Sequence, residues 1–320
     1  MKNIKCFECI EFDIGAFLLS SFWLSLKKKI KSFFLDTSKS GEFRSSVDYF
    51  YEEFSPISEP NLCFFAHYSS SGIVNDYVLY YLQKLRQLGF SIVLCTSTKI
   101  LEEEKVKLKD KVVGILTQEN YGWDFGLWKS GLLYLKDKIK NTPEIENILV
   151  ANDSVYGPFT DLSEIFLEMK RNRFDLWAMS ESFEVDRHIQ SYFIVFNRQV
   201  IQSSFFWNFW EQAKYYFDKQ AVIDNYELQL KDLFEKEGFS CGAFFSGEKI
   251  QKAVSGSAVN VNPTIKLWEP MIYSFHFPFI KGELLRKKML SEKSMDRLKE
   301  FVAAKGYPVS YIERHLNSKR

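Results

Sequence analysis

Two common nucleotide-binding signatures are missing from this sequence. It contains no G-x-x-x-x-G-K-[ST] phosphate loop, and no G-x-G-x-x-G follows its first predicted strand. These motifs bring glycine-rich backbone against phosphates at the start of a helix, in P-loop kinases and in dinucleotide-dependent dehydrogenases respectively. Their absence argues against both classes.

The sequence also lacks an excess of charge, a disulfide framework and a long apolar run. It carries 42 Lys and Arg against 41 Asp and Glu, so no overall positive field attracts nucleic acid. Five irregularly spaced cysteines suit buried thiols in a reducing cytoplasm. The most apolar stretch near the N-terminus, Ile14 to Leu26, is shorter than the ~20 residues that span a bilayer. We therefore expect a cytoplasmic protein with no nucleic-acid partner and no transmembrane helix.

Hydrophobic residues are abundant instead, and many of them are aromatic. They make up 46% of the 320 residues, and aromatic residues alone account for 17%, including 31 Phe and 16 Tyr. This composition predicts a globular protein with a large core, built as one large domain or two small ones.

The first 60 residues differ from the rest because apolar and basic runs alternate. The apolar run over 14–26 is followed at once by charged and then aromatic side chains: Lys27, Lys28, Lys29, Lys31, Phe33 and Phe34. The pattern suits a helix lying on an anionic membrane surface, and equally a helix packed on the main domain. We predict a helical extension over 1–60, with peripheral contact at the inner face of the cytoplasmic membrane as one alternative.

From Asn61 onward, short apolar runs alternate with amphipathic segments, which is the pattern of an α/β domain. Strands are predicted at 62–66, 91–95, 112–116, 148–151, 175–179, 192–196 and 239–245, and helices at 74–88, 125–139, 205–217 and 223–237. Strands in such an order lie mostly parallel, with helices on both faces. We predict one α/β domain over 61–280 and a basic helical tail over 281–320.

Polar groups follow three of the predicted strands, at the end where ligands of open α/β sheets bind. They are 67–72, 120–126 and 152–158, and the second opens a helix with an acid, an amide, two glycines and two aromatics in one turn. An ordinary capped loop and simple helix capping are the structural alternatives for the first two. The candidate donor-binding residues are His67, Tyr68, Asn120, Gly122, Trp123, Asp124, Asn152, Asp153 and Ser154.

Asp153 is the candidate metal ligand. A carboxylate at the end of a central strand, next to other oxygen ligands, suits a Mg²⁺ or Mn²⁺ ion that bridges a diphosphate. The pair of acids flanking one residue that many glycosyltransferases use is missing here. Asp153 could therefore bind a sugar hydroxyl directly instead of a cation.

Glu227 is the candidate catalytic base. An inverting transfer needs a carboxylate that takes the proton from the attacking acceptor hydroxyl. Glu227 lies in a predicted helix whose Leu228, Leu230 and Leu233 face the core, although a solvated surface Glu explains the spacing equally well. A second cluster could shape the acceptor pocket or supply the base: Glu181, Glu184, Asp186 and His188.

Read together, these segments resemble the rhamnan synthesis F family of bacterial polysaccharide glycosyltransferases, over most of 62–286. Five blocks carry the resemblance: Asn120-Tyr121-Gly122-Trp123-Asp124-Phe125-Gly126, Asn152-Asp153-Ser154-Val155-Tyr156-Gly157-Pro158, His188-Ile189-Gln190-Ser191-Tyr192-Phe193, Tyr226-Glu227-Leu228 and Pro278-Phe279-Ile280-Lys281. The first three are the most specific, because long mixed polar and aromatic strings rarely arise from packing needs alone.

The resemblance implies a GT-A-type nucleotide-sugar-binding fold and an inverting hexosyltransferase that extends a lipid-linked O-antigen, capsule or rhamnan glycan. Rhamnose from dTDP-rhamnose is its default donor. By this likeness Asp124 and Asp153 hold the donor and Glu227 acts near the acceptor. The resemblance also implies that Lys281 and Arg286 bind the diphosphate. Along the acceptor cleft it implies three residues: Glu181, His188 and Gln190.

A protein of the same fold that binds or assembles polysaccharide without catalysis is the main alternative. The missing second acid beside Asp153 is its best support. Binding of a nucleotide sugar distinguishes the two hypotheses.

Overall fold

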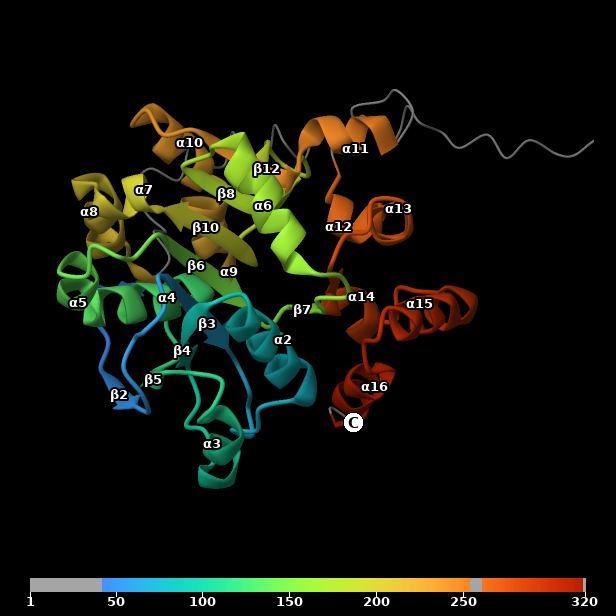
Figure 1. Cartoon of the computed structure of the whole chain (residues 1–320), viewed down its shortest axis with the longest axis horizontal. Coiled ribbons are helices and arrows are strands. Elements are labelled where there is room, and N and C mark those ends of the chain that lie inside the picture. Colours follow the sequence, from blue (N-terminus) through green and yellow to red (C-terminus); the bar gives the residue numbers. More distant parts are fainter. Residues whose placement is uncertain (1–41, 254–260, 319–320) are drawn as a thin grey trace, which may run out of the picture. The chain divides into compact units, whose positions relative to one another are not determined.

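A mixed β-sheet forms the centre of the computed structural model, which describes residues 42–253 and 261–318. The described residues belong to a unit over 41–320. Across the sheet the strands are ordered β12 (Cys241–Phe245), β8 (Leu176–Ser182), β10 (Phe193–Asn197), β6 (Asn147–Asn152), β3 (Asn61–His67), β4 (Phe90–Thr96), β5 (Gly114–Gln118) and β2 (Tyr49–Glu53) (Figure 1). A short strand β9 (His188–Ile189) pairs with β8.

The predicted α/β fold is confirmed, but the sheet is mixed and not mostly parallel. Strands β6, β3, β4 and β5 are parallel neighbours, and so are β12 and β8. Strand β10 runs antiparallel between β8 and β6, and β2 runs antiparallel along the other edge beside β5. The reason at β10 is its connection, because only β9 and short turns separate it from β8, and a parallel return needs a longer crossover.

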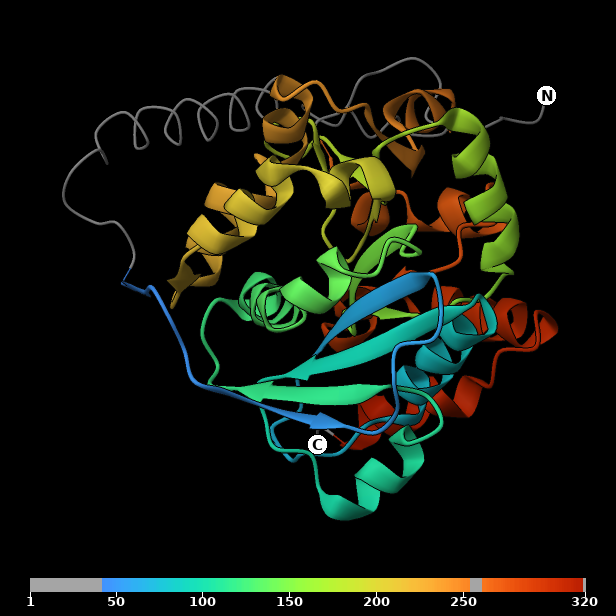
Figure 2. The same ribbon diagram turned by 60° about the vertical axis from the view of Figure 1, so that its left-hand side comes forward.

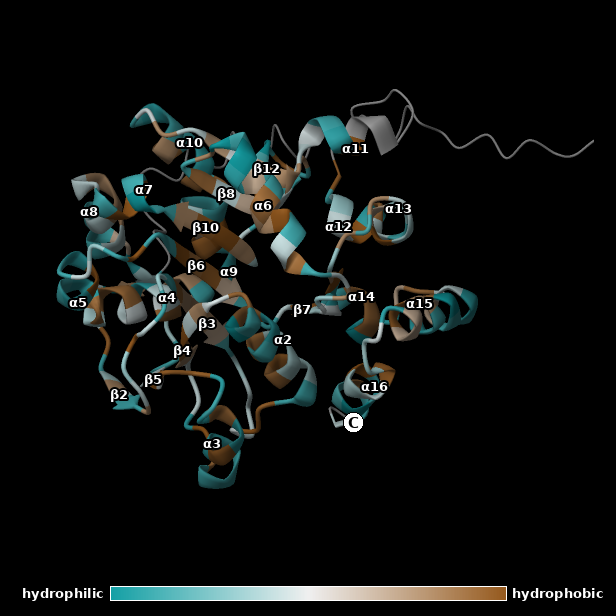
Figure 3. Ribbon diagram, viewed as in Figure 1, coloured by the Kyte–Doolittle hydropathy of each residue, from teal (hydrophilic) through white to brown (hydrophobic). Residues whose placement is uncertain are grey.

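Strands β3 and β4 are buried on both faces, which explains their unbroken apolar sequences. Alternate residues of β3 pack into two different clusters: Cys63 and Phe65 on one side, and Leu62, Phe64 and Ala66 on the other. Such alternation follows from the two-residue period of a strand. Figure 3 shows the hydrophobic strands inside a shell of helices with hydrophilic outer faces.

Each face of the sheet is covered by its own set of helices (Figure 1). One cluster contains residues of α2 (Asp76–Gln87), α6 (Leu162–Asn172), α13 (Trp268–Tyr273), α14 (Gly282–Arg286), α15 (Glu292–Ala304) and α16 (Val309–Ser318). The other contains residues of α4 (Trp123–Tyr134), α5 (Lys136–Lys140), α7 (Arg198–Gln202), α8 (Ser204–Gln212), α9 (Lys219–Val222) and α10 (Leu230–Lys236). Three further helices also contact the first cluster: α3 (Glu102–Leu108), α11 (Gly247–Ala253) and α12 (Pro263–Lys266).

Large aromatic side chains fill the second cluster and explain the high aromatic content. Trp128, Trp210 and Phe206 are fully buried there. Phe206 meets Phe196 of β10 edge to face, with ring centroids 5.1 Å apart. Pairs of this geometry add about 0.5–1.5 kcal/mol beyond the area that they bury.

The prediction of a helix up to residue 60 is wrong in its described part. Phe43–Arg44 is strand β1, which pairs with β11 (Tyr215–Tyr216), and β2 runs along the sheet edge (Figure 2, blue). The physical reason is pairing with the sheet: β2 lies antiparallel along β5, and Tyr51 packs against the core. The predicted amphipathic helix around 14–34 lies outside the described residues.

Two helices predicted further along are interrupted. The segment predicted as helix over 205–217 ends at Gln212, and Tyr215–Tyr216 is a strand. The segment over 223–237 begins with one π-helical turn, η1 (Ile223–Glu227), before α10. Single π-helical turns are rare and often occur at functional sites.

The segment over 281–320 forms α14, α15 and α16, which pack on the main domain. Beside α2, Arg314 Nη2 of α16 lies 2.6 Å from Asp76 Oδ2, and the buried His315 Nδ1 lies 2.8 Å from the hydroxyl of Tyr156. Within 42–253 and 261–318, every helix is too short or too polar to cross a bilayer.

Candidate active site

The candidate site lies where the parallel strands β3 and β6 end. His67 is the last residue of β3, and Asn152 is the last residue of β6. After Asn152 the chain turns into β7 (Val155–Tyr156), which pairs with β13 (Ile280–Lys281). Strand topology therefore brings together three segments that are distant in sequence: the end of β3, the turn from β6 into β7, and β13. Polar groups after the strands predict such a meeting at the carboxyl ends of parallel strands.

Asp153 is held by His67 and by the backbone next to it. His67 Nδ1 lies 2.6 Å from Asp153 Oδ2, and the backbone N–H of Tyr68 donates to the same oxygen at 3.1 Å. The Tyr77 hydroxyl donates to the carbonyl oxygen of Asp153 at 3.1 Å. His67 is 1% exposed and the Asp153 side chain 19% exposed. Asp153 Oδ1, with no hydrogen bond from a described residue, is the oxygen available to a ligand.

Asn152 connects Asp124 to Ser154. Its amide nitrogen donates to Asp124 Oδ2 at 2.7 Å. Its amide oxygen accepts from the backbone N–H of Ser154 at 3.1 Å and from the Ser154 hydroxyl at 2.7 Å. Asp124 thus reaches the end of β6 from the first turn of α4, and the second and third polar groups of the sequence meet as predicted.

The pKa of Asp124 is raised to about 6, first because the carboxyl is buried and second because the charge of Asp153 is close. Glu227 raises it further, while the Asn152 hydrogen bond and the charge of Lys219 oppose the shift. Two carboxylates that share a site resist ionising together. The charges of Asp153 and Glu227 both act on Asp124, so the three carboxylates lie near one another.

Replacing Asp124 by Asn is expected to stabilise the fold at pH 7.5. A raised carboxyl pKa favours the folded state below pH 3.8, and this stability is lost as pH rises through about 6. Asn keeps the acceptor for Asn152 without the charge, so we expect a gain on the order of 1–2 kcal/mol, allowing for partial solvent screening. Urea unfolding at pH 7.5 and pH 4 measures it. An equal gain at both pH values would contradict the electrostatic explanation.

Glu227 is the last residue of η1 and faces His188 of β9. The Ser191 hydroxyl donates to Glu227 Oε2 at 2.8 Å, and His188 Nε2 lies 4.0 Å from Glu227 Oε1. His188 Nδ1 lies 2.7 Å from the carbonyl oxygen of Asp186, so Nδ1 carries the proton that it donates. Nε2 therefore faces the carboxylate. Glu227 is 22% exposed, and its Oε1 is open to a ligand.

Lys281 lies among these acids. It pairs with Val155 across the two short strands, and its ammonium lies 4.1 Å from the ring centroid of Tyr192. Burial lowers the pKa of Lys281 to about 8, Lys219 lowers it further, and the charges of Glu227 and Asp124 oppose the shift. Lys281 is thus a buried cation on which the charges of two carboxylates act.

Sequence reasoning missed Lys219, the first residue of α9. Its charge acts on both Asp124 and Lys281, and its ammonium lies 5.7 Å from the Trp123 ring centroid. Nothing in the local spacing distinguishes it from other exposed lysines. The position of Lys219 depends on strand β11, which directly precedes α9 in a segment that the sequence predicts as helix.

Packing accounts for the two glycines of the second polar group. Gly122 has φ +79°, and a Cβ there would lie 2.8 Å from the Cα of Gly126. A Cβ on Gly126 would lie 2.3 Å from the carbonyl oxygen of Tyr121 and 3.0 Å from Cδ1 of Tyr215. The glycines thus let the start of α4 pack against β11, and a ligand is not needed to explain them.

Replacing Gly126 by Ala is therefore expected to destabilise the fold by about 1–3 kcal/mol through overpacking. Gly238→Ala is the control, because it has φ +89° but no heavy atom within 4 Å of the added Cβ. We expect the control to cost about 1 kcal/mol from backbone strain alone. Thermal unfolding compares the two. An equal or smaller loss for Gly126→Ala would show that β11 moves away at little cost.

Trp123 presents an exposed ring beside Asp124. Its φ is +52°, an unusual value for a bulky residue, and its indole N–H donates to the carbonyl oxygen of Phe217 at 3.1 Å. The side chain is 41% exposed. The chain thus holds a flat aromatic surface in a strained backbone conformation at the edge of the site.

Three further predicted donor-binding residues lie around this site with fewer contacts. Tyr68 is 56% exposed and Asn120 is exposed as well. Arg286 lies against Gly282 and Tyr156. Burial raises the pKa of Tyr156, and the charge and hydrogen bond of Arg286 oppose this rise. The structure therefore places Arg286 behind β7, next to the turn that carries Asp153.

The acceptor candidates divide between the site and the core. Glu181 is 1% exposed and binds Arg187 Nη2 at 3.0 Å and the backbone N–H of Gly247 at 2.7 Å. Gln190 is also buried and accepts from Ser180 at 2.7 Å. Both side chains are occupied by structural contacts, so His188 is the acceptor candidate that the structure places at Glu227.

The fit of a divalent cation depends on Asp124 and Asp153. Within the two described ranges, no three His, Cys, Asp or Glu side chains form a metal-binding group. One oxygen of each carboxylate already accepts hydrogen bonds. Hard cations take about six oxygen ligands. The side chains therefore fit a cation that binds together with a diphosphate, and they do not form a complete site alone.

A G-x-S-x-G string occurs at 238–242, but it does not form a hydrolase site. A nucleophile elbow lies between a strand and the helix after it. Ser240 instead precedes β12, and its hydroxyl donates to Asp175 Oδ2 at 2.8 Å. No hydrogen bond joins it to a described histidine.

Comparison with known proteins shows a family match and two curated relatives. A family model described as rhamnan synthesis protein F matches residues 92–320. The uncharacterized protein y4gN of Sinorhizobium fredii is 29% identical over 203 residues, 62% of this chain and 52% of its own length. Virulence protein VirA of Vibrio anguillarum is 30% identical over 229 residues, 64% of this chain and 72% of its own length. The chain thus spans about half of the first relative.

Several solved structures overlap weakly with the chain. A 4-diphosphocytidyl-2C-methyl-D-erythritol synthase of Anaerococcus prevotii has TM-score 0.37 and 12% identity, covering 58% of this chain and 88% of its own. The mannosyltransferase Ktr4p of S. cerevisiae has TM-score 0.31 and 10% identity, covering 64% and 71%. Mouse xyloside xylosyltransferase 1 has TM-score 0.29 and 12% identity, covering 68% and 92%. With scores this low, family assignment rests on the sequence matches.

The family match contains most of the candidate site. It includes Asp124, Asp153, His188, Glu227 and Lys281, and it extends through the C-terminal helices, beyond the end of the resembling blocks. It begins after β3, so His67 lies outside it. The match covers well over half of the sequence, and the chain belongs to the rhamnan synthesis protein F family.

Proposed function

We propose that this protein is a glycosyltransferase of polysaccharide biosynthesis, which moves a sugar from a nucleotide donor to a saccharide acceptor at the candidate site. One observation carries the proposal: Asp124, Asp153, Glu227 and Lys281 come from four separate segments, yet their charges act on one another at one edge of the sheet. Burying charge is costly, and perturbed groups of this kind cluster at functional sites.

The cations of the site suit the leaving group. Transfer breaks the bond between the anomeric carbon and the diphosphate, so negative charge grows on the departing oxygen. Lys281, with Lys219 beside it, supplies positive charge where a diphosphate next to Asp124 would lie. Fixed charges that stabilise a developing anion commonly provide the largest single contribution to catalysis.

The acids suit the other half of the reaction. Glu227 Oε1 is free of hydrogen bonds and faces His188, so an acceptor hydroxyl bound there can lose its proton to the carboxylate as it attacks. Attack from the face opposite the leaving group inverts the anomeric centre. Asp124 and Asp153 remain to bind the donor's hydroxyls.

A divalent cation is part of the proposal only together with the donor. Asp124 and Asp153 would hold it through their open oxygens, and bound there it would neutralise charge on the diphosphate. Lys281 and Lys219 already supply part of that charge. We propose Mg²⁺ or Mn²⁺ as an aid to donor binding, to be tested by titration with and without the ion.

The finer assignments follow from the family. We propose a GT-A-type fold, dTDP-rhamnose as the donor and a lipid-linked O-antigen, capsule or rhamnan chain as the acceptor. Action at the inner face of the cytoplasmic membrane belongs to the same proposal. The family's description and the cationic and acidic halves of the site support these assignments.

Calorimetric titration with dTDP-rhamnose and other nucleotide sugars, with and without Mn²⁺, tests the proposal. We expect binding to the wild type and at least tenfold weaker binding to Asp153→Asn. Asp110→Asn is the control, because Asp110 is exposed and pairs with Lys111 on another surface. A wild type that binds no nucleotide or nucleotide sugar would contradict the proposal and support a non-catalytic, polysaccharide-binding protein.

A further inference from the structure

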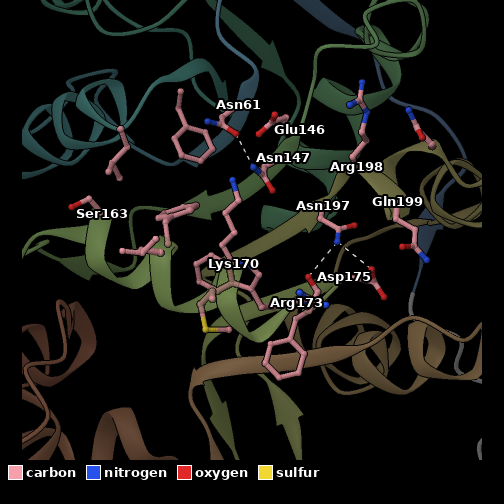
Figure 4. Close-up of a pocket in the computed structure, with 18 of the residues that line it drawn as sticks. Asn61, Glu146, Asn147, Ser163, Lys170, Arg173, Asp175, Asn197, Arg198 and Gln199 are labelled. Atoms are coloured by element: carbon pink, nitrogen blue, oxygen red, sulfur yellow. Dashed lines mark hydrogen bonds between the residues drawn. The ribbon is translucent and has the colours of Figure 1, made fainter.

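A cavity lies at the amino ends of the central strands, opposite the end that carries the candidate active site. Its volume is about 1120 Å³, and its walls include the first residues of three parallel strands: Asn61 of β3, Phe90 of β4 and Asn147 of β6 (Figure 4). Strands β3 and β6 run from this cavity to His67 and Asn152. At about 3.3 Å per residue, the two sites are roughly 20 Å apart.

Three cations line the cavity without an acidic partner. They are Lys170 and Arg173, at the end of α6, and Arg198, at the start of α7. None of the three forms an ion pair with a residue in 42–253 or 261–318, whereas many other lysines of the chain do. In Figure 4 the Lys170 side chain extends toward Asn147.

The two carboxylates in the cavity wall, Glu146 and Asp175, offset only part of these charges. Asp175 accepts hydrogen bonds from the backbone and hydroxyl of Ser240 and from the Asn197 amide, and these bonds hold its pKa below its usual value. Glu146 is exposed and makes no ion pair with a described residue. Three cations against two carboxylates leave the wall with a net charge of +1, which favours a ligand that carries negative charge.

The other walls of the cavity suit a ligand rich in hydroxyls. The Asn147 amide nitrogen donates to Asn61 Oδ1 at 2.8 Å, which leaves the Asn147 amide oxygen and the Asn61 amide nitrogen open. Trp177 is only 5% exposed, yet its indole N–H donates to no described residue. Phe166 packs on both Trp177 and Phe90 and completes an aromatic wall.

We infer that this cavity binds an anionic oligosaccharide, such as a stretch of a saccharide chain that carries carboxylate or phosphate groups. Amides, an open indole N–H and aromatic faces match sugar rings, and the unpaired cations match their acidic substituents. The volume exceeds the usual 300–1,000 Å³ of small-ligand pockets, which favours a ligand of several units. A planar membrane surface would reach the rim but not Asn61 or Trp177.

This inference rests on the proposed function for the kind of ligand, because a polysaccharide enzyme handles a chain longer than its active site. A second binding site roughly 20 Å from the reaction, at the far ends of β3 and β6, would retain the chain between transfers. Linking two sites raises the effective concentration of the chain at the active site.

Calorimetric titration of the full-length protein with an oligogalacturonate of fixed length tests the inference. The matched neutral probe is a malto-oligosaccharide of equal length, and inorganic phosphate and anionic phosphatidylglycerol vesicles are further probes. We expect the oligogalacturonate to bind at least tenfold more tightly than the neutral probe. Equal binding of the two saccharides would overturn the inference, and so would tighter binding of vesicles or phosphate than of the oligosaccharide.

Two variants assign the binding to this cavity. Lys170→Gln with Arg198→Gln removes two of the cations and is expected to weaken oligogalacturonate binding at least tenfold. Arg173→Asn removes the third cation. Arg173 has φ +56°, a conformation that Asn tolerates, so the fold is retained. The control is Lys236→Gln, an exposed lysine of α10. Unchanged affinity in both cavity variants would overturn the inference.

The same variants separate this inference from the proposed function. Their affinity for dTDP-rhamnose is expected to stay within twofold of the wild type. Binding of the oligosaccharide without any binding of nucleotide sugar would refute the proposed function and leave the cavity assigned. The reverse result would refute the cavity alone.

Discussion

Replacing Glu227 by Gln is expected to slow sugar transfer by about 10²–10⁴-fold, the usual contribution of a general base. Gln has the same size and can still accept the hydrogen bond from Ser191, but it cannot take a proton from the acceptor hydroxyl. Because we propose that the donor's diphosphate binds at Lys281, affinity for the nucleotide sugar should stay within twofold. Single-turnover rates and calorimetric titration measure the two effects separately.

Glu235→Gln is the matched control for this prediction. Glu235 lies on α10, shortly after η1, and its carboxylate pairs with Lys231 on the surface at 2.6 Å. We expect its transfer rate to match the wild type within a factor of two. A Glu227→Gln enzyme that transfers sugar as fast as this control would remove Glu227 as the base.

His188 offers a second readout of the same site. Its Nε2 faces Glu227 Oε1 at 4.0 Å while its Nδ1 is bound to the backbone, so its ring is oriented to contact whatever hydroxyl Glu227 binds. Substitution of His188 therefore ought to raise the KM for the acceptor more than the KM for the donor. The structure places no comparable group at Glu181, whose carboxylate is occupied.

The strands that form the centre of the sheet could be predicted from sequence, because each is a short apolar run that must be buried. The runs that became β3, β4, β5 and β6 were located to within about two residues. Strand direction was harder. The sequence around β10 is as apolar as that of a parallel strand, and only its short connection to β8 makes it antiparallel.

The acids of the site could be predicted because they follow strands, and strand ends meet at one edge of a sheet. Asp153 follows β6 directly, and Asp124 opens the helix after β5. Lys219 could not be found in this way, since it follows β11, a two-residue strand inside a segment with helical periodicity. Glu181 shows the opposite limit: its position near the end of β8 resembles that of a site residue, yet its carboxylate pairs with Arg187.

The charges of the site work against the stability of the fold. Asp124 has a raised pKa and Lys281 a lowered one, so near pH 7 each carries a charge that its surroundings disfavour. A fold optimised for stability alone would replace them by neutral residues. Their presence together indicates that the site is arranged for a ligand that brings its own charges.

Replacing Lys281 by Met is expected to weaken binding of the nucleotide sugar and to slow transfer by about 10²–10³-fold, as removal of a preorganised charge does in other enzymes. In the wild type, donor affinity should fall as pH rises through about 8, because Lys281 then loses its proton. A bound diphosphate raises this pKa and is itself bound less tightly once the ammonium is neutral. The Met variant should lack this pH step.

Titration calorimetry with dTDP-rhamnose between pH 6.5 and 9.5 measures the step, and Lys287→Met supplies the control. Lys287 lies six residues further along, on the surface, where it pairs with Glu283. The stability of the fold gives an independent check. The pKa of Lys281 is about 8 in the folded protein and 10.5 in the unfolded chain, so the unfolded chain holds more protons between these pH values. The contribution of Lys281 to wild-type stability therefore rises with pH over this range. The same pH dependence of donor affinity in the wild type and in Lys281→Met would exclude Lys281 from the diphosphate site. Lys219 or a divalent cation would then have to stabilise the charge of the departing diphosphate.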